Sequence, residues 1–187
     1  MVRKVFEWTI PILWLLWLGY WWFEARNTAR TQKSESLLTA VLYRGATVIG
    51  VVLIFGLKRQ RTQLWPVTVP LLGIAVIFML CGFAFAIWAR RHIGRFWSAR
   101  VTLKEGHQLI ESGPYRLVRH PIYSGLLLSM AATVMTIGSV QSLCGYALLV
   151  GALIFKLAAE ERLLTANFGP AYQKYQKRVK ALIPGVI

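Results

Sequence analysis

The sequence predicts an all-α, polytopic membrane protein with about five transmembrane helices, and its composition carries that prediction. Hydrophobic residues make up 56% of the 187 residues and charged residues only 16%, a balance unlike that of a soluble domain of this size. The apolar residues gather into runs of about 17 to 25, the length that an α-helix needs to cross the hydrocarbon core. The formal net charge of +15 suits an anionic membrane face or a nucleic acid, and the apolar runs favour the membrane.

Five apolar runs account for the predicted spans. They are residues 5–23, 37–57, 65–89, 121–137 and 142–159. No small-x-small cleavage site follows the first run, so we interpret it as a retained span rather than a signal peptide. The turn-like residues 138–141 join the last two runs into a helical hairpin.

We expect a single membrane domain over residues 1–187. Residues 1–64 would hold two N-terminal spans, and residues 65–187 the third span, a polar loop, the hairpin and a tail. The tail is mixed and basic from residue 160 onward, which predicts a C-terminal amphipathic helix that ends before Pro184.

The basic residues predict how the spans are oriented. Five spans place the first loop, the polar loop and the tail on one side, and that side collects 16 of the 22 basic residues. The other side holds five of them: Arg3, Lys4, Lys58, Arg59 and Arg61. The positive-inside rule therefore makes the polar loop and the tail cytoplasmic. In a bacterium this would be the inner membrane.

The polar loop, residues 90–120, is where we expect chemistry, because it carries seven basic residues and all three histidines. Two antiparallel helices of similar length return the chain to the depth at which the first one began. His120 should therefore lie near Glu160 and Glu161 at the cytoplasmic face. The same geometry brings further polar side chains to these carboxylates: Tyr115, Arg119 and Tyr123.

The fourth run begins in a way that suits ligand binding. Pro121 is favourable in the first turn of a helix, and the amides of that turn would favour an anionic group in the polar loop. Gly125, one turn further on, leaves room for the close approach of a ligand.

Each of these elements also has an ordinary interpretation. Arg119 and His120 would be the positively charged residues that commonly flank a membrane span. Glu160 and Glu161 would be exposed to solvent at the end of a helix, and His107 would be a loop histidine without a partner. Arg44, inside the second run, either faces a cavity or a partner or extends along its helix to the cytoplasmic face. Composition does not explain the joint order of a polar loop, an Arg-His-Pro helix start, a hairpin and a carboxylate pair.

That order resembles a known family. The stretches Gly-His-Gln-Leu-Ile at 106–110, Ser-Gly-Pro-Tyr at 112–115 and Arg-His-Pro-Ile-Tyr-Ser-Gly at 119–125 are similar to the isoprenylcysteine carboxyl methyltransferases and the related membrane phospholipid methyltransferases. The tail resembles the family's C-terminal signature in these residues: Glu160, Glu161, Phe168, Gly169, Tyr172, Tyr175, Ile183 and Pro184. Together the motifs cover about half of the chain.

The resemblance implies an integral membrane methyltransferase that uses S-adenosylmethionine, with residues 65–187 as its cofactor-binding catalytic core. The residues that it implies at the cofactor are His107, Gln108, Leu109, Ile110, Tyr115, His120, Pro121, Tyr123, Gly125, Glu160 and Glu161. Of the charged groups, Arg119, His120 and Glu160 are the catalytic candidates.

The resemblance also implies where the substrate binds. Lys156 stands where the eukaryotic enzymes have an arginine implicated in substrate handling, so the charge is kept but the planar fork for a carboxylate is lost. Lys156 and Arg44 are the substrate-binding candidates, and the expected partner is a lipid or a lipidated small molecule.

The chemistry of methyl transfer fits the residues present. The reaction is an in-line displacement that depends on alignment, so it requires neither a metal nor a covalent nucleophile, and the sequence predicts no metal site. A carboxylate acceptor needs no base at pH 7, whereas an ammonium or thiol acceptor must first lose a proton. His120 is the candidate base in that second case.

Other functions compete with this one. A phospholipid or amine N-methyltransferase is the nearest alternative. A membrane NADPH-dependent reductase is another, since the sterol reductases share a related C-terminal architecture, although their helix bundle is larger. A non-enzymatic scaffold that binds anionic lipid explains the charge but not the motif. Nucleic acid is not an expected partner, because the basic residues flank the spans.

Overall fold

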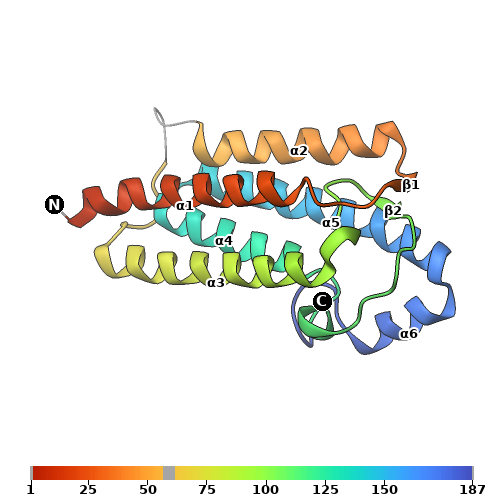
Figure 1. The fold of residues 1–187 in the computed structure, drawn as a ribbon. Coiled ribbons are helices and arrows are strands. Elements are labelled where there is room, and N and C mark those ends of the chain that lie inside the picture. The colour runs from red at the N-terminus through yellow and green to blue at the C-terminus, as the bar shows by residue number, and fades with distance from the viewer. Residues whose placement is uncertain (1, 57–61, 187) are drawn as a thin grey trace.

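The apolar runs of the sequence are helical over most of their length. The structure, a computed structural model, describes residues 2–56 and 62–186. Within these ranges the chain forms five long helices, which lie side by side and alternate in direction (Figure 1). They are α1 (Val2–Glu24), α2 (Leu37–Phe55), α3 (Val69–Ile93), α4 (Pro121–Ile137) and α5 (Val140–Phe168). The all-α prediction is confirmed in this respect.

Three of these helices are long and apolar enough to cross a membrane. They are residues Leu37–Phe55, Val69–Phe96 and Val140–Phe168, and Pro121–Ile137 is a shorter apolar helix. The count of five spans therefore stays a prediction. Of the residues used to predict the orientation, Lys58, Arg59 and Arg61 lie outside the described residues, as does Leu57 at the end of the second run.

Polar side chains set the beginnings of three helices. Ser36 and Thr68 accept the backbone N–H groups of the residues three positions on, which starts α2 and α3. Ser139 and Ser142 form a reciprocal cap at the start of α5. The predicted turn over residues 138–141 is therefore too long: Gly138, at φ 65°, and Ser139 make the turn, and the helix already begins at Val140.

The tail also differs from its prediction. α5 continues through both glutamates to Phe168, so the amphipathic helix does not begin at residue 160. The chain turns at Gly169, whose φ is 53°, and Pro170 starts the short helix α6 (Pro170–Arg178). The Gly169 N–H still donates to the Thr165 carbonyl, but its positive φ turns the chain away from the helix axis, and Pro170 has no N–H with which to continue the helix.

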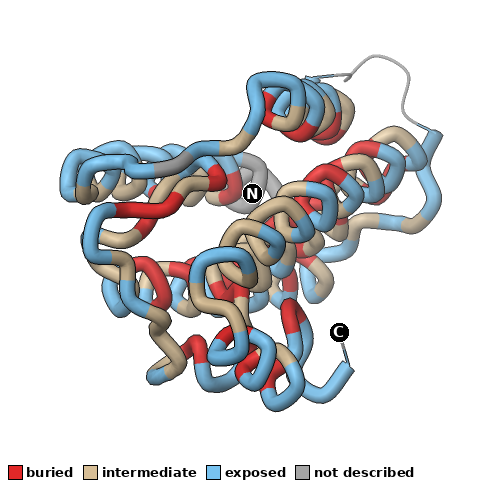
Figure 2. The backbone as a smooth tube through the Cα atoms, turned by 90° about the vertical axis from the view of Figure 1, so that its right-hand side faces the viewer, coloured by how far each residue is buried: buried red, intermediate tan, exposed pale blue. Residues whose placement is uncertain are grey.

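The helices pack in two close pairs, α3 with α4 and α2 with α5. Gly82 of α3 faces Gly125 of α4, and Gly50 of α2 faces Gly145 of α5, so the backbones approach closely at both crossings. The two helices of the predicted hairpin, α4 and α5, run antiparallel (Figure 1). Each of them packs mainly against a different helix, α4 against α3 and α5 against α2. Figure 2 shows the buried positions along the inner sides of the helices.

Aromatic side chains attach α1 to α3. The ring of Trp17 stacks on that of Phe83, with centroids 4.5 Å apart, and Trp14 meets the same phenylalanine edge-on at 5.0 Å. Trp14 also donates a hydrogen bond to the hydroxyl of Thr133 on α4. The aromatic residues of the first run therefore include core residues such as Trp17 as well as exposed ones such as Trp8 and Trp22.

One end of the bundle gathers the first loop, the polar loop and the tail (Figure 1). There β1 (Thr31–Ser34) pairs antiparallel with β2 (Thr102–Lys104), which the sequence did not indicate. The 3-10 helices η1 (Gly94–Phe96) and η2 (Gly113–Arg116) and the helix α6 lie in the same region. This arrangement agrees with the prediction that these three segments share one side.

We expect Gly125→Ala to destabilise the protein, because a Cβ at this position would overlap the carbonyl oxygen of Gly82. Overpacking of this kind costs about 1–3 kcal/mol, so the midpoint of thermal unfolding in detergent should fall. Gly73→Ala on α3 is the matched control, since a Cβ there meets nothing within 4 Å. Equal midpoints for the two variants would contradict the packing described here.

Candidate active site

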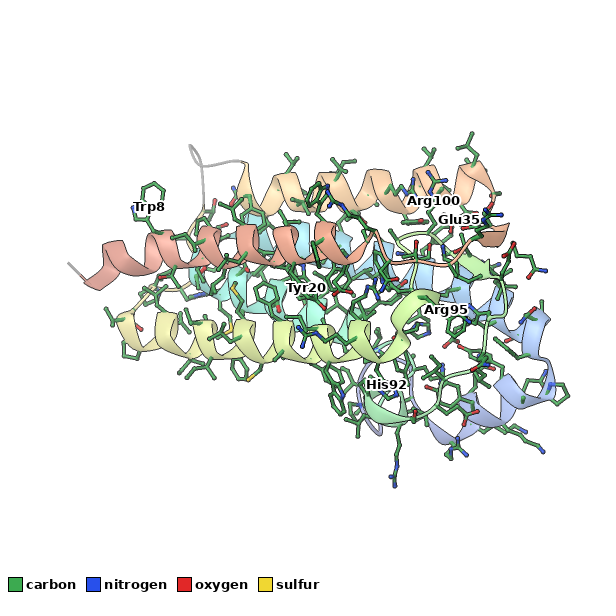
Figure 3. The ribbon with its side chains drawn as sticks, in the orientation of Figure 1. Trp8, Tyr20, Glu35, His92, Arg95 and Arg100 are labelled. Atoms are coloured by element: carbon green, nitrogen blue, oxygen red, sulfur yellow. The ribbon has the colours of Figure 1, made fainter. Side chains whose placement is uncertain are left out.

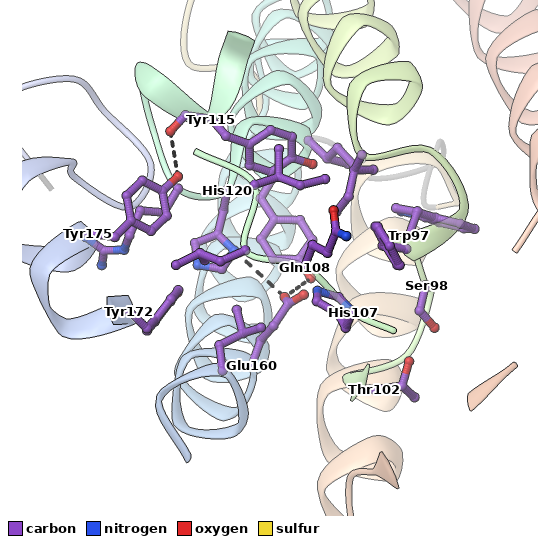
Figure 4. Close-up of a pocket in the computed structure, with 18 of the residues that line it drawn as sticks. Trp97, Ser98, Thr102, His107, Gln108, Tyr115, His120, Glu160, Tyr172 and Tyr175 are labelled. Atoms are coloured by element: carbon purple, nitrogen blue, oxygen red, sulfur yellow. Dashed lines mark hydrogen bonds and ion pairs between the residues drawn. The ribbon is translucent and has the colours of Figure 1, made fainter. Parts of the chain in front are cut away.

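A pocket lies at the end of the bundle that carries β1 and β2, and Figure 4 shows it in close-up. Apolar and polar side chains line it together, and we call it the polar pocket because the charged residues Arg119, His120 and Glu160 are among them. Its walls come from the segment after α3, the polar loop, the start of α4, the end of α5 and α6. Most of the residues predicted at the cofactor or in catalysis line it: His107, Gln108, Leu109, Ile110, Tyr115, Arg119, His120, Tyr123 and Glu160. The antiparallel course of α4 and α5 brings these distant residues together, as the hairpin argument predicts.

Glu160 presents its carboxylate to this pocket. The hydroxyl of Tyr123 donates a 2.6 Å hydrogen bond to Glu160 Oε2, and His120 Nδ1 lies 3.8 Å from the same oxygen. The rings of His120 and Tyr123 are parallel, with centroids 5.5 Å apart. Glu160 stays 30% exposed, so the pocket holds a carboxylate that is oriented by its neighbours and accessible to a ligand.

Glu161 has a different role, because it lies outside the pocket wall. Arg119 Nε donates to Glu161 Oε1 at 2.7 Å, and His120 Nε2 lies 3.1 Å from the same oxygen. Gln176 of α6 donates to its other oxygen. The resemblance implies Glu161 at the cofactor, whereas the structure shows it as the acceptor that joins α4, α5 and α6.

The tail fastens to the start of α4. The backbone N–H groups of Arg119 and His120 donate to the carbonyls of Lys180 and Ala181, and the Ser124 hydroxyl donates to that of Leu182. The amides of residues 119 and 120, which precede α4, therefore bind the tail, and the expected anionic group at the first turn of α4 stays a prediction. The guanidinium of Arg119 donates to the carbonyls of Gln176 and Val179 as well as to Glu161.

Aromatic rings form much of the remaining wall. Tyr175 donates a hydrogen bond to the carbonyl of Tyr115 at 2.5 Å, and burial raises the pKa of both phenols and of Tyr172. These hydroxyls therefore remain protonated at neutral pH. The ring of His107 lies between those of Phe96 and Phe168, at centroid distances of 5.2 and 5.8 Å.

Besides Glu161, two of the residues implied at the cofactor do not line the pocket. Pro121 is buried in the first turn of α4. Gly125 faces Gly82 and Ala86 of α3, so the room that its missing side chain leaves is filled by a helix and not by a ligand. The expectation that Gly125 admits a ligand is therefore wrong, because a close helix crossing gives the same sequence signal.

A second, apolar cavity of about 990 Å³ adjoins the polar pocket. Side chains of α1, α2, α4 and α5 line it, and Arg44 and Lys156 stand among them. Lys156 Nζ donates to the carbonyl of Ala99 at 2.9 Å and lies 5.4 and 5.1 Å from the ring centroids of Tyr43 and Tyr123. Arg44 is exposed and lines this cavity, which is compatible with the first of its two interpretations; its role stays a prediction.

The two cavities share a wall made of Trp97, Ser98, Ile122 and Tyr123. Trp97 and Ser98 belong to no motif, so sequence reasoning did not select them. Trp97 is 8% exposed although it follows a basic stretch. A buried tryptophan in a polar loop becomes recognisable only when the loop is folded back on the bundle. Across the described residues, no group of three His, Cys, Asp or Glu side chains is placed to hold a metal.

Comparison with known proteins shows which sequences and structures this chain is similar to. Residues 75–166 match the model of the isoprenylcysteine carboxyl methyltransferase (ICMT) family. The chain is 29% identical over 180 residues to methanethiol S-methyltransferase 1 of Bradyrhizobium diazoefficiens, covering 88% of this chain and 58% of that protein. It is 33% identical over 86 residues to a probable protein-S-isoprenylcysteine O-methyltransferase of Oryza sativa subsp. indica, covering 46% and 45%. The chain thus spans about half the length of these relatives.

A solved structure shows the same fold. It is that of the eukaryotic intramembrane Ras methyltransferase ICMT, with a TM-score of 0.53 and 22% sequence identity, covering 80% of this chain and 52% of that chain. At this identity the likeness concerns the fold. Together with the apolar helices, it indicates an integral membrane protein.

We expect the environment of His107 to make stability depend on pH. Burial lowers the pKa of His107, and the nearby Glu160 only partly offsets this effect. As the pH falls through about 6.5, the unfolded chain binds a proton that the folded chain excludes, so the folded state loses stability. Thermal unfolding between pH 8 and 5 should show a smaller loss for His107→Gln than for the wild type. Identical pH profiles would show that this histidine is not responsible.

Proposed function

Because residues 75–166 match the model of the isoprenylcysteine carboxyl methyltransferase family, we propose that the chain belongs to this family and transfers a methyl group from S-adenosylmethionine to a lipophilic acceptor. The observation that carries the proposal is the shared wall between a polar pocket and an apolar cavity. A polar cofactor and an apolar acceptor would meet at this wall. The relatives' names describe methyl transfer to methanethiol and to isoprenylcysteine, and we extend only the reaction type to this chain.

The polar pocket suits S-adenosylmethionine, which supplies a methyl group on a positively charged sulfur. Glu160 offers a carboxylate for an ammonium or for ribose hydroxyls. The rings of Tyr115 and Tyr123 offer faces for the sulfonium, and His107, between two phenylalanines, lies where an adenine would find aromatic neighbours. The cavity in the polar pocket is about 90 Å³, well below the 300–1,000 Å³ usual for such ligands, so binding requires wall side chains to move.

The apolar cavity suits a hydrocarbon chain that arrives from the bilayer. Its walls come from helices that we predict to span the membrane, and the charged side chains of Arg44 and Lys156 are among its lining residues. Two cations favour an acceptor that is negatively charged when it attacks, such as a carboxylate or a thiolate. The same charges would repel a lipid ammonium, which makes the amine N-methyltransferase the less suitable alternative.

The residues at the shared wall would align the acceptor with the methyl group. Tyr123 reaches both cavities and is fixed through its hydroxyl to Glu160. A carboxylate acceptor attacks without losing a proton, whereas a thiol must first give one up. His120, held between the two glutamates, is our candidate to take that proton. By the positive-inside argument, this reaction would take place at the cytoplasmic face.

We expect the detergent-purified protein to bind S-adenosylhomocysteine in a calorimetric titration, and Glu160→Gln to weaken that binding about tenfold or more. A hydrogen bond to a charged group contributes about 1.5–3 kcal/mol, and 1.4 kcal/mol corresponds to tenfold in affinity. Glu105→Gln, which changes an exposed carboxylate in the same loop region, should bind like the wild type. A folded wild type that binds NADPH and not S-adenosylhomocysteine would favour the reductase instead.

We expect the protein to transfer a labelled methyl group to decanethiol or to N-acetyl-S-farnesylcysteine in preference to phosphatidylethanolamine. Lys156→Met should lower kcat/KM for the preferred acceptor about tenfold, because it removes a cation from the cavity, and Lys156→Arg should retain most of it. Lys174→Met, at an exposed position of α6, is the control. Methylation of the amine lipid alone would contradict the assignment of an anionic acceptor.

A further inference from the structure

Resting on the proposed function, we propose that Arg90 is a positioning residue for methyl transfer, which acts by holding Trp97 in the wall between the two cavities. Arg90 belongs to the last turn of α3 and is not among the residues that line either cavity. Its effect on the reaction therefore has to pass through another side chain. Trp97 lines both cavities and is the aromatic member of the segment 97–101, which we call the partition segment.

Arg90 is buried more completely than any other charged side chain described, at 1% exposure. Its guanidinium donates to the carbonyls of Glu24 at 2.5 Å and Gly94 at 2.8 Å, and a longer bond reaches that of Asn27. The Glu24 carboxylate lies 3.5 Å away. A buried charge is costly unless it is paired in this way, and these partners fix the guanidinium between the ends of α1 and α3.

The fixed guanidinium in turn locates Trp97. Its central carbon lies 4.8 Å from the centroid of the Trp97 ring, within the range of a cation–π contact. Trp97 is also in contact with Trp21 of α1, whose ring lies perpendicular to it with centroids 5.4 Å apart and which lines the apolar cavity. Arg90 and Trp21 thus both contact the Trp97 ring, and Figure 4 shows Trp97 at the edge of the polar pocket.

The rest of the partition segment is held by other charges. Lys156 donates to the carbonyl of Ala99, and the Glu35 carboxylate accepts the N–H of Val101 while the Glu35 N–H donates to the Val101 carbonyl. Glu35 also accepts from the hydroxyl of Tyr43. Arg90 therefore holds the partition segment at Trp97, whereas Glu35 holds its other end at Val101.

This arrangement predicts a specific kinetic effect. Trp97 is one of many residues around the polar pocket, so displacing it should change cofactor affinity little. Alignment of acceptor and methyl group is more demanding, since a misplacement of about 1 Å can cost about a hundredfold in rate. Loss of Arg90 should therefore lower kcat while leaving the affinity for S-adenosylhomocysteine almost unchanged.

The first test compares Arg90→Met with Arg91→Met, which removes an exposed arginine from the next position of the same helix. The acceptor is whichever of decanethiol and N-acetyl-S-farnesylcysteine the wild type methylates. We expect kcat to fall at least tenfold for Arg90→Met, with S-adenosylhomocysteine affinity within about threefold of the wild type. Arg91→Met should keep both. Unchanged kcat, or an equal loss of affinity and kcat, would overturn the proposal.

A double-mutant cycle tests whether the effect passes through Trp97. If it does, Arg90→Met should lower kcat no further once Trp97→Leu has removed the ring, and Trp97→Phe, which keeps a ring under the guanidinium, should retain more activity than Trp97→Leu. Additive losses would mean that Arg90 acts by another route.

A third measurement does not depend on catalysis. Arg95 and Arg100, which Figure 3 labels, are both exposed and flank Trp97 in the sequence, so limited trypsin digestion in detergent reports on the partition segment. We expect Arg90→Met to speed cleavage after these two arginines relative to cleavage in α6, and Arg91→Met to leave it unchanged. Equal cleavage in all three proteins would overturn the proposal.

A wild type that binds S-adenosylhomocysteine but methylates no acceptor contradicts the proposed function, and the digestion then decides alone whether Arg90 holds the segment.

Discussion

The ion pair between Glu161 and Arg119 is the contact on which the polar pocket depends. The two side chains meet at 2.6 Å and join the end of α5 to the start of α4, and Gln176 and the carbonyls bound by Arg119 extend the network to α6 and the tail. Both side chains are largely buried, where removing one partner of a pair costs several kcal/mol. Because Glu161 makes these contacts, the preceding Glu160 is directed into the pocket, so adjacent carboxylates take separate structural and ligand-facing roles.

This basic chain has few carboxylates, and most of the glutamates that the structure describes pair with residues far away in the sequence. Glu24 pairs with Arg90, Glu35 holds Tyr43 and the partition segment, and Glu111 pairs with Arg178 at the surface. These contacts join segments far apart in sequence, and several cross between the helical bundle and the loops at one end. Seven glutamates against 22 basic residues thus leave most cations facing solvent or lipid head groups, while the paired ones determine where the loops fold back.

The helices and the meeting of His120 with the glutamates followed from the sequence, because apolar length and antiparallel return are local and geometric properties. The family motifs located most of the pocket wall. What the sequence did not indicate depends on tertiary contacts. Gly125 serves a helix crossing that looks like a ligand approach until Gly82 is opposite it. Trp97 lies in no motif and gains its position from Arg90 and Trp21. The β1–β2 pair is too short to show a period.

The wall between the two cavities would keep a polar cofactor and an apolar acceptor apart. A polar cofactor and an apolar acceptor would each lower the other's binding if they shared one space, since polar groups lose hydration beside hydrocarbon. Here Trp97 and Tyr123 lie between them, and each presents an aromatic face together with one polar atom. Such side chains tolerate both environments. The wall can therefore separate the bulk of the two ligands while leaving their reacting ends in contact, which is the geometry that an in-line transfer requires.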